Sequence, residues 1–282
     1  MKNRLFLPAF LSLALVMGVL LPILTPDAEA GAPEEVLIRY NGETINMDSP
    51  PLMIDATTYV PLYDFCKEMG PATLLRESDI EPFAETVVAS GIVIRAVEGE
   101  CYITANERYL YAGSLCQNVE GKIYVPIRTI AKAFGFSVFW TQWAKRAVLY
   151  HPTGIIESGR TFYNENDVYW MSRIINAEAG GECMDGKIAV GNVVMNRIDS
   201  PLCPNTVYDV IFDNRFGVQF TPAYSGAVYC SPNPESIIAA KLALEGASVI
   251  GTSLYFNASS SWSWASRNRP YVTTIGNHCF FG

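Results

Sequence analysis

A stretch of thirteen residues occurs twice in the first half of the chain, and this repeat restricts the fold more than any other feature. The segment TYVPLYDFCKEMG at 58–70 aligns with IYVPIRTIAKAFG at 123–135, an offset of 65 residues. In each copy a Tyr-Val-Pro sequence precedes a run with helical character, and Gly70 or Gly135 closes it. Proline suits the first turn of a helix and glycine its end. Each copy therefore predicts a short strand followed by a helix.

More strands are expected around the two copies. The runs ATLLRE at 72–77 and SVFWTQ at 137–142 each follow a predicted helix. The segment at 86–113, between the copies, has the alternation and the turn residues that are typical of β-hairpins. Residues 34–150 are therefore expected to form one α+β domain built from two related halves, each with a strand-helix-strand order.

The second half of the chain predicts helices first and a small sheet last. Trp170, Ile174 and Ala177 recur at helical spacing, with Asp167 as the expected N-cap and two glycines at the end. The expected helices lie at 167–179, 184–197, near 207 and at 234–246, and the expected strands at 252–258, 271–276 and 278–282. We expect this second α+β domain, the catalytic one, to cover 167–282, after a polar linker without periodicity at 151–166.

The first thirty residues differ from the rest in composition. A short basic start precedes an almost wholly apolar run at 5–24, and the small residues of AEA follow at 28–30. This pattern predicts a secretory signal peptide at 1–30. The alternative is an uncleaved membrane anchor, because about 20 apolar residues can span a bilayer. Cleavage predicts an exported protein with no stable membrane insertion.

Charge and scarce residue types argue against several kinds of function. The chain has a net charge of −8 and no Lys/Arg cluster, so nucleic acid is not an expected partner. Only His151 and His278 are present, too few for a histidine-based zinc or copper site, and no G-x-S-x-G motif occurs. We therefore expect no metal and no cofactor. Seven cysteines in an exported chain allow disulfides, but the sequence does not define their pairing.

The sequence NAEAGGE at 176–182 places Glu178 at the C-terminal end of an apolar helix. The helix dipole and burial both disfavour an ionised carboxylate there, so the pKa of Glu178 should be raised. A raised pKa suits a general acid near neutral pH. The alternative is an ordinary solvated helix end. Glu182 lies beyond the two glycines and could cap the next helix at its N-terminus.

The same region resembles a family of enzymes. The elements A-E-A-x-G-E, A-V-x-x-V-x-N-R, P-N-T and V-I occur in order over 177–211, followed by VQFTP at 218–222, SLYFN at 253–257 and IGNHCF at 275–280. By these motifs the C-terminal half resembles the cell wall hydrolase family of the spore cortex-lytic enzymes. The repeat-containing half is similar to the copper amine oxidase N-terminal-like domain. That similarity implies a stalk or targeting module, with a purely structural domain as the alternative.

The resemblance implies a reaction and a site. The family cleaves the MurNAc-GlcNAc bond of peptidoglycan glycan strands, as lytic transglycosylases that form 1,6-anhydroMurNAc. The first glutamate of A-E-A, here Glu178, is implied to be the only catalytic carboxylate and to act as general acid/base. Hydrolysis needs a second carboxylate, whereas the C6 hydroxyl of muramic acid can attack C1 intramolecularly at a very high effective concentration. The expected location is extracytoplasmic, in the cell wall or spore cortex.

Six further residues are expected to bind the glycan, by hydrogen bonds to N-acetyl and hydroxyl groups or by stacking on sugar faces: Gln219, Phe220, Tyr255, Asn257, Trp264 and Asn277. For each aromatic ring the alternative is a place in the core. His278 is expected to be a hydrogen-bonded structural residue. Two other functions stay open, an N-acetylmuramoyl-L-alanine amidase and a non-catalytic wall-binding protein.

Overall fold

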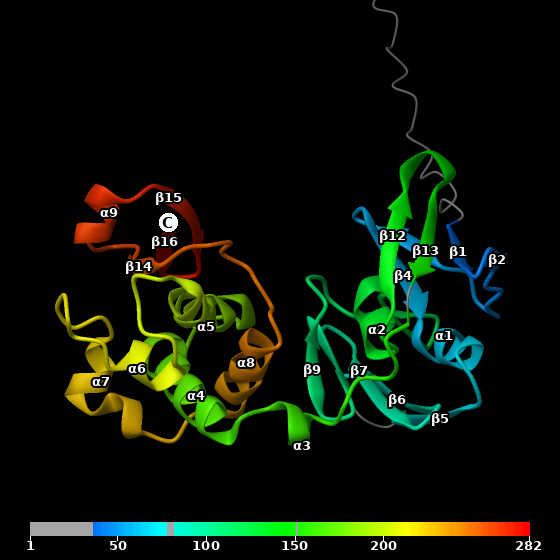
Figure 1. The fold of residues 1–282 in the computed structure, drawn as a ribbon. Coiled ribbons are helices and arrows are strands. Elements are labelled where there is room, and N and C mark those ends of the chain that lie inside the picture. The colour runs from blue at the N-terminus through cyan, green and yellow to red at the C-terminus, as the bar shows by residue number, and fades with distance from the viewer. Residues whose placement is uncertain (1–35, 78–81, 151) are drawn as a thin grey trace, which may run out of the picture. The chain divides into compact units, whose positions relative to one another are not determined.

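The two repeated segments form matching strands and helices in the computed structural model (Figure 1). β4 (Thr57–Pro61) leads into α1 (Leu62–Glu68), and β11 (Lys122–Pro126) leads into α2 (Ile127–Ala133). The strands β4 and β11 pair antiparallel, with Val60 opposite Val125. Because these two valines are equivalent in the repeat, the pairing has an approximate twofold symmetry. The structure describes residues 36–77, 82–150 and 152–282.

The prolines of the repeat end the strands rather than begin the helices. Pro61 and Pro126 are the N-caps of α1 and α2, with extended backbone ψ angles of 125° and 129°. The expectation that they occupy the first helical turn was therefore off by one residue. The glycines that follow each helix behave as expected, because Gly70 and Gly135 both have positive φ angles.

The described strands of the first half form three sheets. One has the order β10-β11-β4-β3, and a second has the order β12-β13-β1-β2, in which β1 and β13 are parallel. The third is the antiparallel meander β5-β6-β7-β8-β9. Their remaining bounds are β1 (Leu37–Tyr40), β2 (Glu43–Thr44), β3 (Leu52–Ile54), β5 (Ala72–Glu77), β6 (Ala84–Ala89), β7 (Ile92–Val97), β8 (Tyr102–Ala105), β9 (Arg108–Tyr111), β10 (Gln117–Val119), β12 (Ser137–Thr141) and β13 (Arg146–Tyr150), with a short 3₁₀ turn η1 (Gln142–Ala144).

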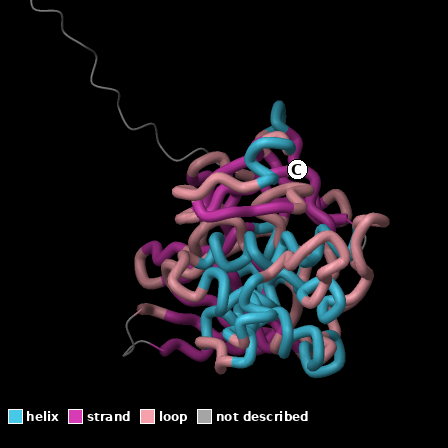
Figure 2. The backbone as a smooth tube through the Cα atoms, turned by 90° about the vertical axis from the view of Figure 1, so that its left-hand side faces the viewer, coloured by secondary structure: helices cyan, strands magenta, loops and turns pink. Residues whose placement is uncertain are grey.

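Helices dominate the second half (Figure 2). A core of aliphatic side chains lies between α4, α5 and α8, and a sheet of order β14-β16-β15 follows at the end of the chain. The elements are α3 (Gly159–Phe162), α4 (Glu165–Ala179), α5 (Met184–Asp199), α6 (Val207–Ile211), α7 (Thr221–Ser225), η2 (Ala227–Tyr229), α8 (Pro234–Leu244), β14 (Tyr255–Ala258), α9 (Trp264–Asn268), β15 (Tyr271–Ile275) and β16 (His278–Phe281). The α+β content expected from the sequence is confirmed.

The start of α4 differs from the expected one. Asn164 is the N-cap, and its side chain accepts hydrogen bonds from the backbone N–H groups of Asn166 and Asp167. Asp167 therefore lies inside the first turn, where a carboxylate is also favourable. The N-cap of α8 is Asn233, whose side chain accepts a hydrogen bond from the backbone N–H of Ser236.

Buried polar contacts join the strands of the first half to the helices of the second, and the described residues belong to one compact unit. Arg108 on β9 makes a bidentate ion pair with Glu245, which follows α8, at 2.6 and 2.7 Å. The Glu245 side chain is 1% exposed. Tyr111 on β9 donates a hydrogen bond of 2.8 Å to Asp185 in the first turn of α5. These contacts bury polar groups in pairs, which is the condition for tolerating them away from water.

The segment expected to be a linker contains the short helix α3. The backbone N–H of Gly159 donates to the carbonyl of Asn106 at 2.8 Å, and that of Ile156 donates to Ala133 at 3.2 Å. The predicted signal peptide at 1–30 and His151 lie outside the described residues. In the part of the chain that is described, no helix combines the length and the apolar character needed to cross a bilayer.

Candidate active site

Glu178 is the next-to-last residue of α4 and lies on the side of the helix that faces the core. Met171, Ile174 and Ile175 form the fully buried stripe of this helix. Glu178 follows them at the spacing i+7, i+4 and i+3, so it continues the same stripe. Its side chain is consequently half-buried although the helix ends at Ala179, one residue later.

The carboxyl group of Glu178 has no hydrogen-bond or ion-pair partner among the residues that the structure describes. Burial alone raises its pKa from an ordinary value of 4.5 to about 7. A carboxyl group with this pKa is protonated in a large fraction of molecules near neutral pH. It can therefore donate a proton to a substrate, as the sequence predicted for this position.

Glu182 has the opposite electrostatic setting. Its carboxylate accepts the side-chain amide of Asn277 at 2.9 Å and the backbone N–H of the same residue at 3.2 Å. Hydrogen bonds to the ionised form hold the pKa of Glu182 below its usual value. The expectation that Glu182 caps α5 was wrong, because its carboxylate binds the turn between β15 and β16 instead, and the N-cap is Cys183.

The turn that receives Glu182 requires glycine at one position. Gly276 has a φ angle of +56°, and a Cβ atom built there would collide with Oε2 of Glu182. A side chain would thus be strained by the backbone conformation and would also displace the carboxylate. In the IGNHCF motif the glycine thus leaves room for the Glu182 carboxylate, and the asparagine donates hydrogen bonds to it. Asn277, which was expected to bind substrate, donates its side-chain amide to Glu182 instead.

A polar network holds the C-terminal end of α4 against the start of α8. The side-chain oxygen of Asn176 accepts from the backbone N–H of Asn233 at 3.0 Å and from the hydroxyl of Ser236 at 3.3 Å. The Asn233 amide donates to the carbonyl of Gly180 at 3.2 Å. These bonds fix the backbone on both sides of Glu178, so they position its side chain.

Lys187 on α5 stabilises the same contact between the end of α4 and the start of α8. Its side chain is 2% exposed, and its ammonium group donates to Glu235 at 2.7 Å and to the carbonyl of Glu182. A buried lysine is tolerated only with partners of this kind. Lys187 was not among the residues expected at the site, although its place directly before the apolar run at 188–190 is a signal of burial in the sequence.

Of the six residues expected to bind glycan, the structure brings two together. The rings of Tyr255 on β14 and Trp264 on α9 lie 5.7 Å apart in an edge-to-face arrangement. The Arg269 guanidinium lies 5.3 Å from both ring centres. Trp264 is 59% exposed, so one of its faces is open for stacking on a sugar. No hydrogen bond, ion pair or ring contact within the described ranges joins this aromatic pair to Glu178.

Three other expected residues have structural partners. Phe220 is 1% exposed within the core, so it has no free face and the expectation that it stacks on a sugar was wrong. Asn257 uses its amide group on the carbonyls of Ala258 and Ser261, and its oxygen accepts from Ser263. Gln219 donates to the carbonyl of Gly217 at 2.8 Å and remains partly exposed.

His278 is buried on β16 against the ring of Phe256, with the ring centres 5.3 Å apart. Its Nδ1 atom is buried, and no residue of the described chain is within hydrogen-bonding distance of it. The hydrogen-bonded role expected for His278 is therefore not found at this nitrogen. Burial lowers the pKa of His278, so the imidazole is mainly neutral at neutral pH.

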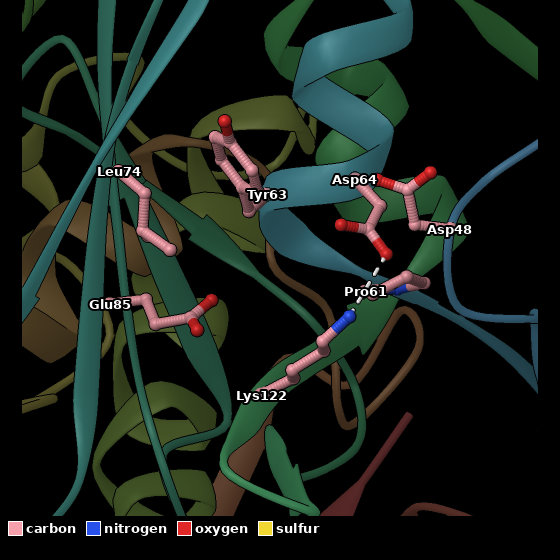
Figure 3. A pocket seen from close by; sticks show the side chains of 7 residues that line it. All are labelled: Asp48, Pro61, Tyr63, Asp64, Leu74, Glu85 and Lys122. Atoms are coloured by element: carbon pink, nitrogen blue, oxygen red, sulfur yellow. Dashed lines mark hydrogen bonds and ion pairs between the residues drawn. The ribbon is translucent and has the colours of Figure 1, made fainter.

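A separate hollow of about 420 Å³ lies in the repeat-containing half. Figure 3 shows Lys122 pointing toward Asp64, to which it is paired at 3.4 Å, with Asp48 and Glu85 also on the lining. The Asp64 carboxylate also accepts the backbone N–H of Ser49 at 2.9 Å. Asp48 is in turn paired with Lys67 at 2.9 Å. Across the described residues, no group of three or more His, Cys, Asp or Glu side chains is placed to hold a metal ion.

Comparison with known families agrees with both resemblances. The Cell Wall Hydrolase family matches residues 181–281, and the Copper amine oxidase N-terminal domain matches residues 39–149. The C-terminal half is thus a cell wall hydrolase domain and the N-terminal half a copper amine oxidase N-terminal domain, as the motifs predicted. The first match begins three residues after Glu178, so the role of this residue depends on its own geometry.

Individual relatives share the name spore cortex-lytic enzyme. Those of Oceanobacillus iheyensis and Bacillus cereus are each 36% identical over 122 residues, which is 42% of this chain and 42% or 45% of theirs. The chain therefore spans less than half the length of these curated relatives. A solved structure, the catalytic domain of the germination-specific lytic transglycosylase SleB from Bacillus anthracis, is 33% identical. The comparison covers 45% of this chain and all of that one, with a TM-score of 0.40.

Proposed function

We propose that this chain is an exported bacterial enzyme that cleaves the MurNAc-GlcNAc bond of peptidoglycan as a lytic transglycosylase. Its N-terminal two-copy module accompanies a C-terminal catalytic domain, and Glu178 acts as the general acid/base. The relatives named spore cortex-lytic enzyme support cortex peptidoglycan, degraded during germination, as the substrate. The observation that carries the proposal is the half-buried, unpartnered Glu178 with a pKa of about 7.

One carboxyl group is sufficient for this reaction. Protonated Glu178 gives its proton to the glycosidic oxygen, and the bond from this oxygen to C1 of MurNAc breaks. The resulting carboxylate then removes the proton of the C6 hydroxyl, whose oxygen forms the new bond to C1. The products are a GlcNAc hydroxyl end and a 1,6-anhydroMurNAc end, and Glu178 is protonated again. A pKa near 7 suits both halves of this cycle, because the same group must donate and accept a proton.

The contrast between the pKa values of Glu178 and Glu182 raises an alternative reaction, the hydrolysis of the glycosidic bond. Two carboxyl groups whose pKa values are driven apart are the usual components of a glycoside hydrolase. In this chain the ionised member, Glu182, has both oxygens engaged by Asn277. A carboxylate held in this way is a poorer base or nucleophile than a free one, which favours the single-acid mechanism.

A digest of purified peptidoglycan tests the proposal. We expect disaccharide peptides that end in 1,6-anhydroMurNAc, which are lighter by one water molecule than the hydrolysis products in mass spectrometry. Reducing MurNAc ends would establish a hydrolase instead, and free stem peptides would establish an amidase. The absence of any released product would favour a wall-binding protein. Cortex and vegetative sacculi digested in parallel identify the preferred wall.

Two variants separate the roles of the glutamates. Glu178→Gln keeps the shape of the side chain and removes its proton, so we expect a loss of at least about a hundredfold in cleavage rate. Glu182→Gln removes a charge that binds the Asn277 turn, so we expect weaker folding but the same anhydro product. Undiminished cleavage by Glu178→Gln contradicts the proposed mechanism.

A further inference from the structure

A groove with a cavity volume of about 770 Å³ is lined by residues from β8, β9, α3, α4 and α8. Its volume is in the usual range for binding sites of small ligands. Three tyrosines line it, Tyr109, Tyr163 and Tyr169. Both halves of the chain contribute to it, so neither half forms this groove without the other.

Two cations in the groove have no carboxylate partner among the described residues. The Lys241 ammonium lies 4.9 Å from the ring centre of Tyr109 and 5.3 Å from that of Tyr163. The Arg173 guanidinium lies 3.7 Å from the ring centre of Tyr169, and its Nε atom is buried without a hydrogen-bond partner there. The aromatic faces hold both cations in place by cation–π attraction, which leaves their N–H donors available.

The charge of the groove contrasts with that of the chain. The whole chain has a net charge of −8. Arg160 is on the groove wall as a third cation, and the described residues that line the groove include two acids, Glu107 and Glu165. Arg160 is already paired with Glu107 at 2.6 Å. Lys241 and Arg173 exceed the remaining acid, Glu165, by one positive charge, so the groove is net positive and favours an anionic ligand.

We propose that this groove binds the free carboxylates of a peptidoglycan stem peptide, with Lys241 and Arg173 as the charged contacts. The inference rests on the proposed function, because a wall-degrading enzyme meets stem peptides on every glycan strand. Carboxylates pair with guanidinium and ammonium groups through charge-assisted hydrogen bonds. The tyrosine rings add apolar contact for the alanine methyl groups. Such a site lets the N-terminal module take part in holding the wall.

The test uses the intact chain and the tripeptide L-Ala-D-isoglutamyl-meso-diaminopimelate, which has no glycosidic bond and is not consumed. Binding is measured by isothermal titration at low salt. We expect binding that weakens as salt is added. We expect Lys241→Met and Arg173→Met each to weaken it at least about tenfold, because each removes a charge-assisted hydrogen bond to a carboxylate. Lys241→Arg, which keeps the charge, should retain most of the affinity.

The control is Lys67→Met, which removes one positive charge from an exposed side chain that pairs with Asp48 outside the groove. It should bind like the parent chain, and thermal unfolding of each variant checks its fold. The proposal would be overturned if the tripeptide amidated at every carboxyl group bound as tightly as the free tripeptide. It would also be overturned if glycerol phosphate bound and the tripeptide did not. Because no glycan is cleaved in this assay, its failure is distinct from a failure of the lytic activity.

Discussion

Replacing Glu178 by glutamine should make the protein more stable at alkaline pH, although it removes the proposed catalytic acid. The physical reason is that the fold half-buries this carboxyl group, which has no hydrogen-bond or ion-pair partner in the part of the chain that the structure describes. Folding therefore favours the protonated form, and the folded state retains this proton to a higher pH than the unfolded chain does. Stability is highest below the unfolded pKa and falls as the pH rises toward the folded one.

The magnitude follows from the two pKa values. The folded pKa is about 7 and the ordinary value is 4.5, so between these values the folded state binds more protons than the unfolded state. At 1.36 kcal/mol for each pKa unit, the cost of ionising Glu178 in the fold reaches about 3 kcal/mol above pH 7. The side chain is partly exposed, so this value is an upper bound. Glutamine has no charge to desolvate and escapes the cost.

The assay is urea unfolding of the parent chain and Glu178→Gln at pH 4, 6 and 8, followed by tryptophan fluorescence. The two proteins should have similar free energies of unfolding at pH 4. At pH 8 the variant should be more stable, by up to about 3 kcal/mol. A constant difference between them at all three pH values would show that the carboxyl group has an ordinary pKa. The argument for Glu178 as a general acid near neutral pH would then fail.

Glu178, the Gly276 turn and the Arg108–Glu245 pair each lead to one more prediction. The ratio kcat/KM for glycan cleavage should fall above pH 7 as Glu178 loses its proton, by about tenfold for each pH unit, and a rate that is constant up to pH 9 contradicts its role as the acid. Gly276→Ala should lower the thermal midpoint more than Gly251→Ala does, because the φ angles are +56° and +55° but only the first Cβ would meet a side chain. Arg108→Met should cost up to about 3–5 kcal/mol in the free energy of unfolding, because it removes the bidentate partner of buried Glu245 and leaves that carboxylate with only Lys132 at 3.6 Å and the Tyr163 hydroxyl at 3.1 Å among the described residues, and Arg108→Met/Glu245→Leu should recover part of it.

Local patterns in the sequence predicted the elements of the fold well. The 65-residue repeat predicted two strand-helix units, and helical spacing predicted the stripe of α4 that ends near Glu178. These predictions succeeded because the spacing of apolar residues reports directly on which side of an element is buried. The pairing of β4 with β11 depends on two segments far apart in the chain, which no local pattern specifies.

The candidate site was less predictable because its supporting contacts are long-range. Glu182 was assigned to the nearest helix, since a helix N-terminus attracts negative charge. In the structure it binds Asn277, which is 95 residues later in the sequence. Phe220 was expected to stack on a sugar because it lies in the VQFTP stretch of the family resemblance, with a core position as the alternative, and its ring is in the core. A single sequence shows a residue's type and its neighbours, and these two residues are defined by contacts with distant elements.

The contrast between the two glutamates explains why a chain with Glu178 and Glu182 so close in sequence can assign them different work. The two glycines between them end α4 and turn the chain, so the side chains enter different surroundings. Glu178 stays on the buried stripe and pays a desolvation cost that raises its pKa to about 7. Glu182 leaves the helix and reaches Asn277, whose N–H donors stabilise its charge. Glu178 is therefore suited to moving a proton and Glu182 to holding the β15–β16 turn. Because both residues are glutamate, their surroundings alone decide which of them can act as the general acid.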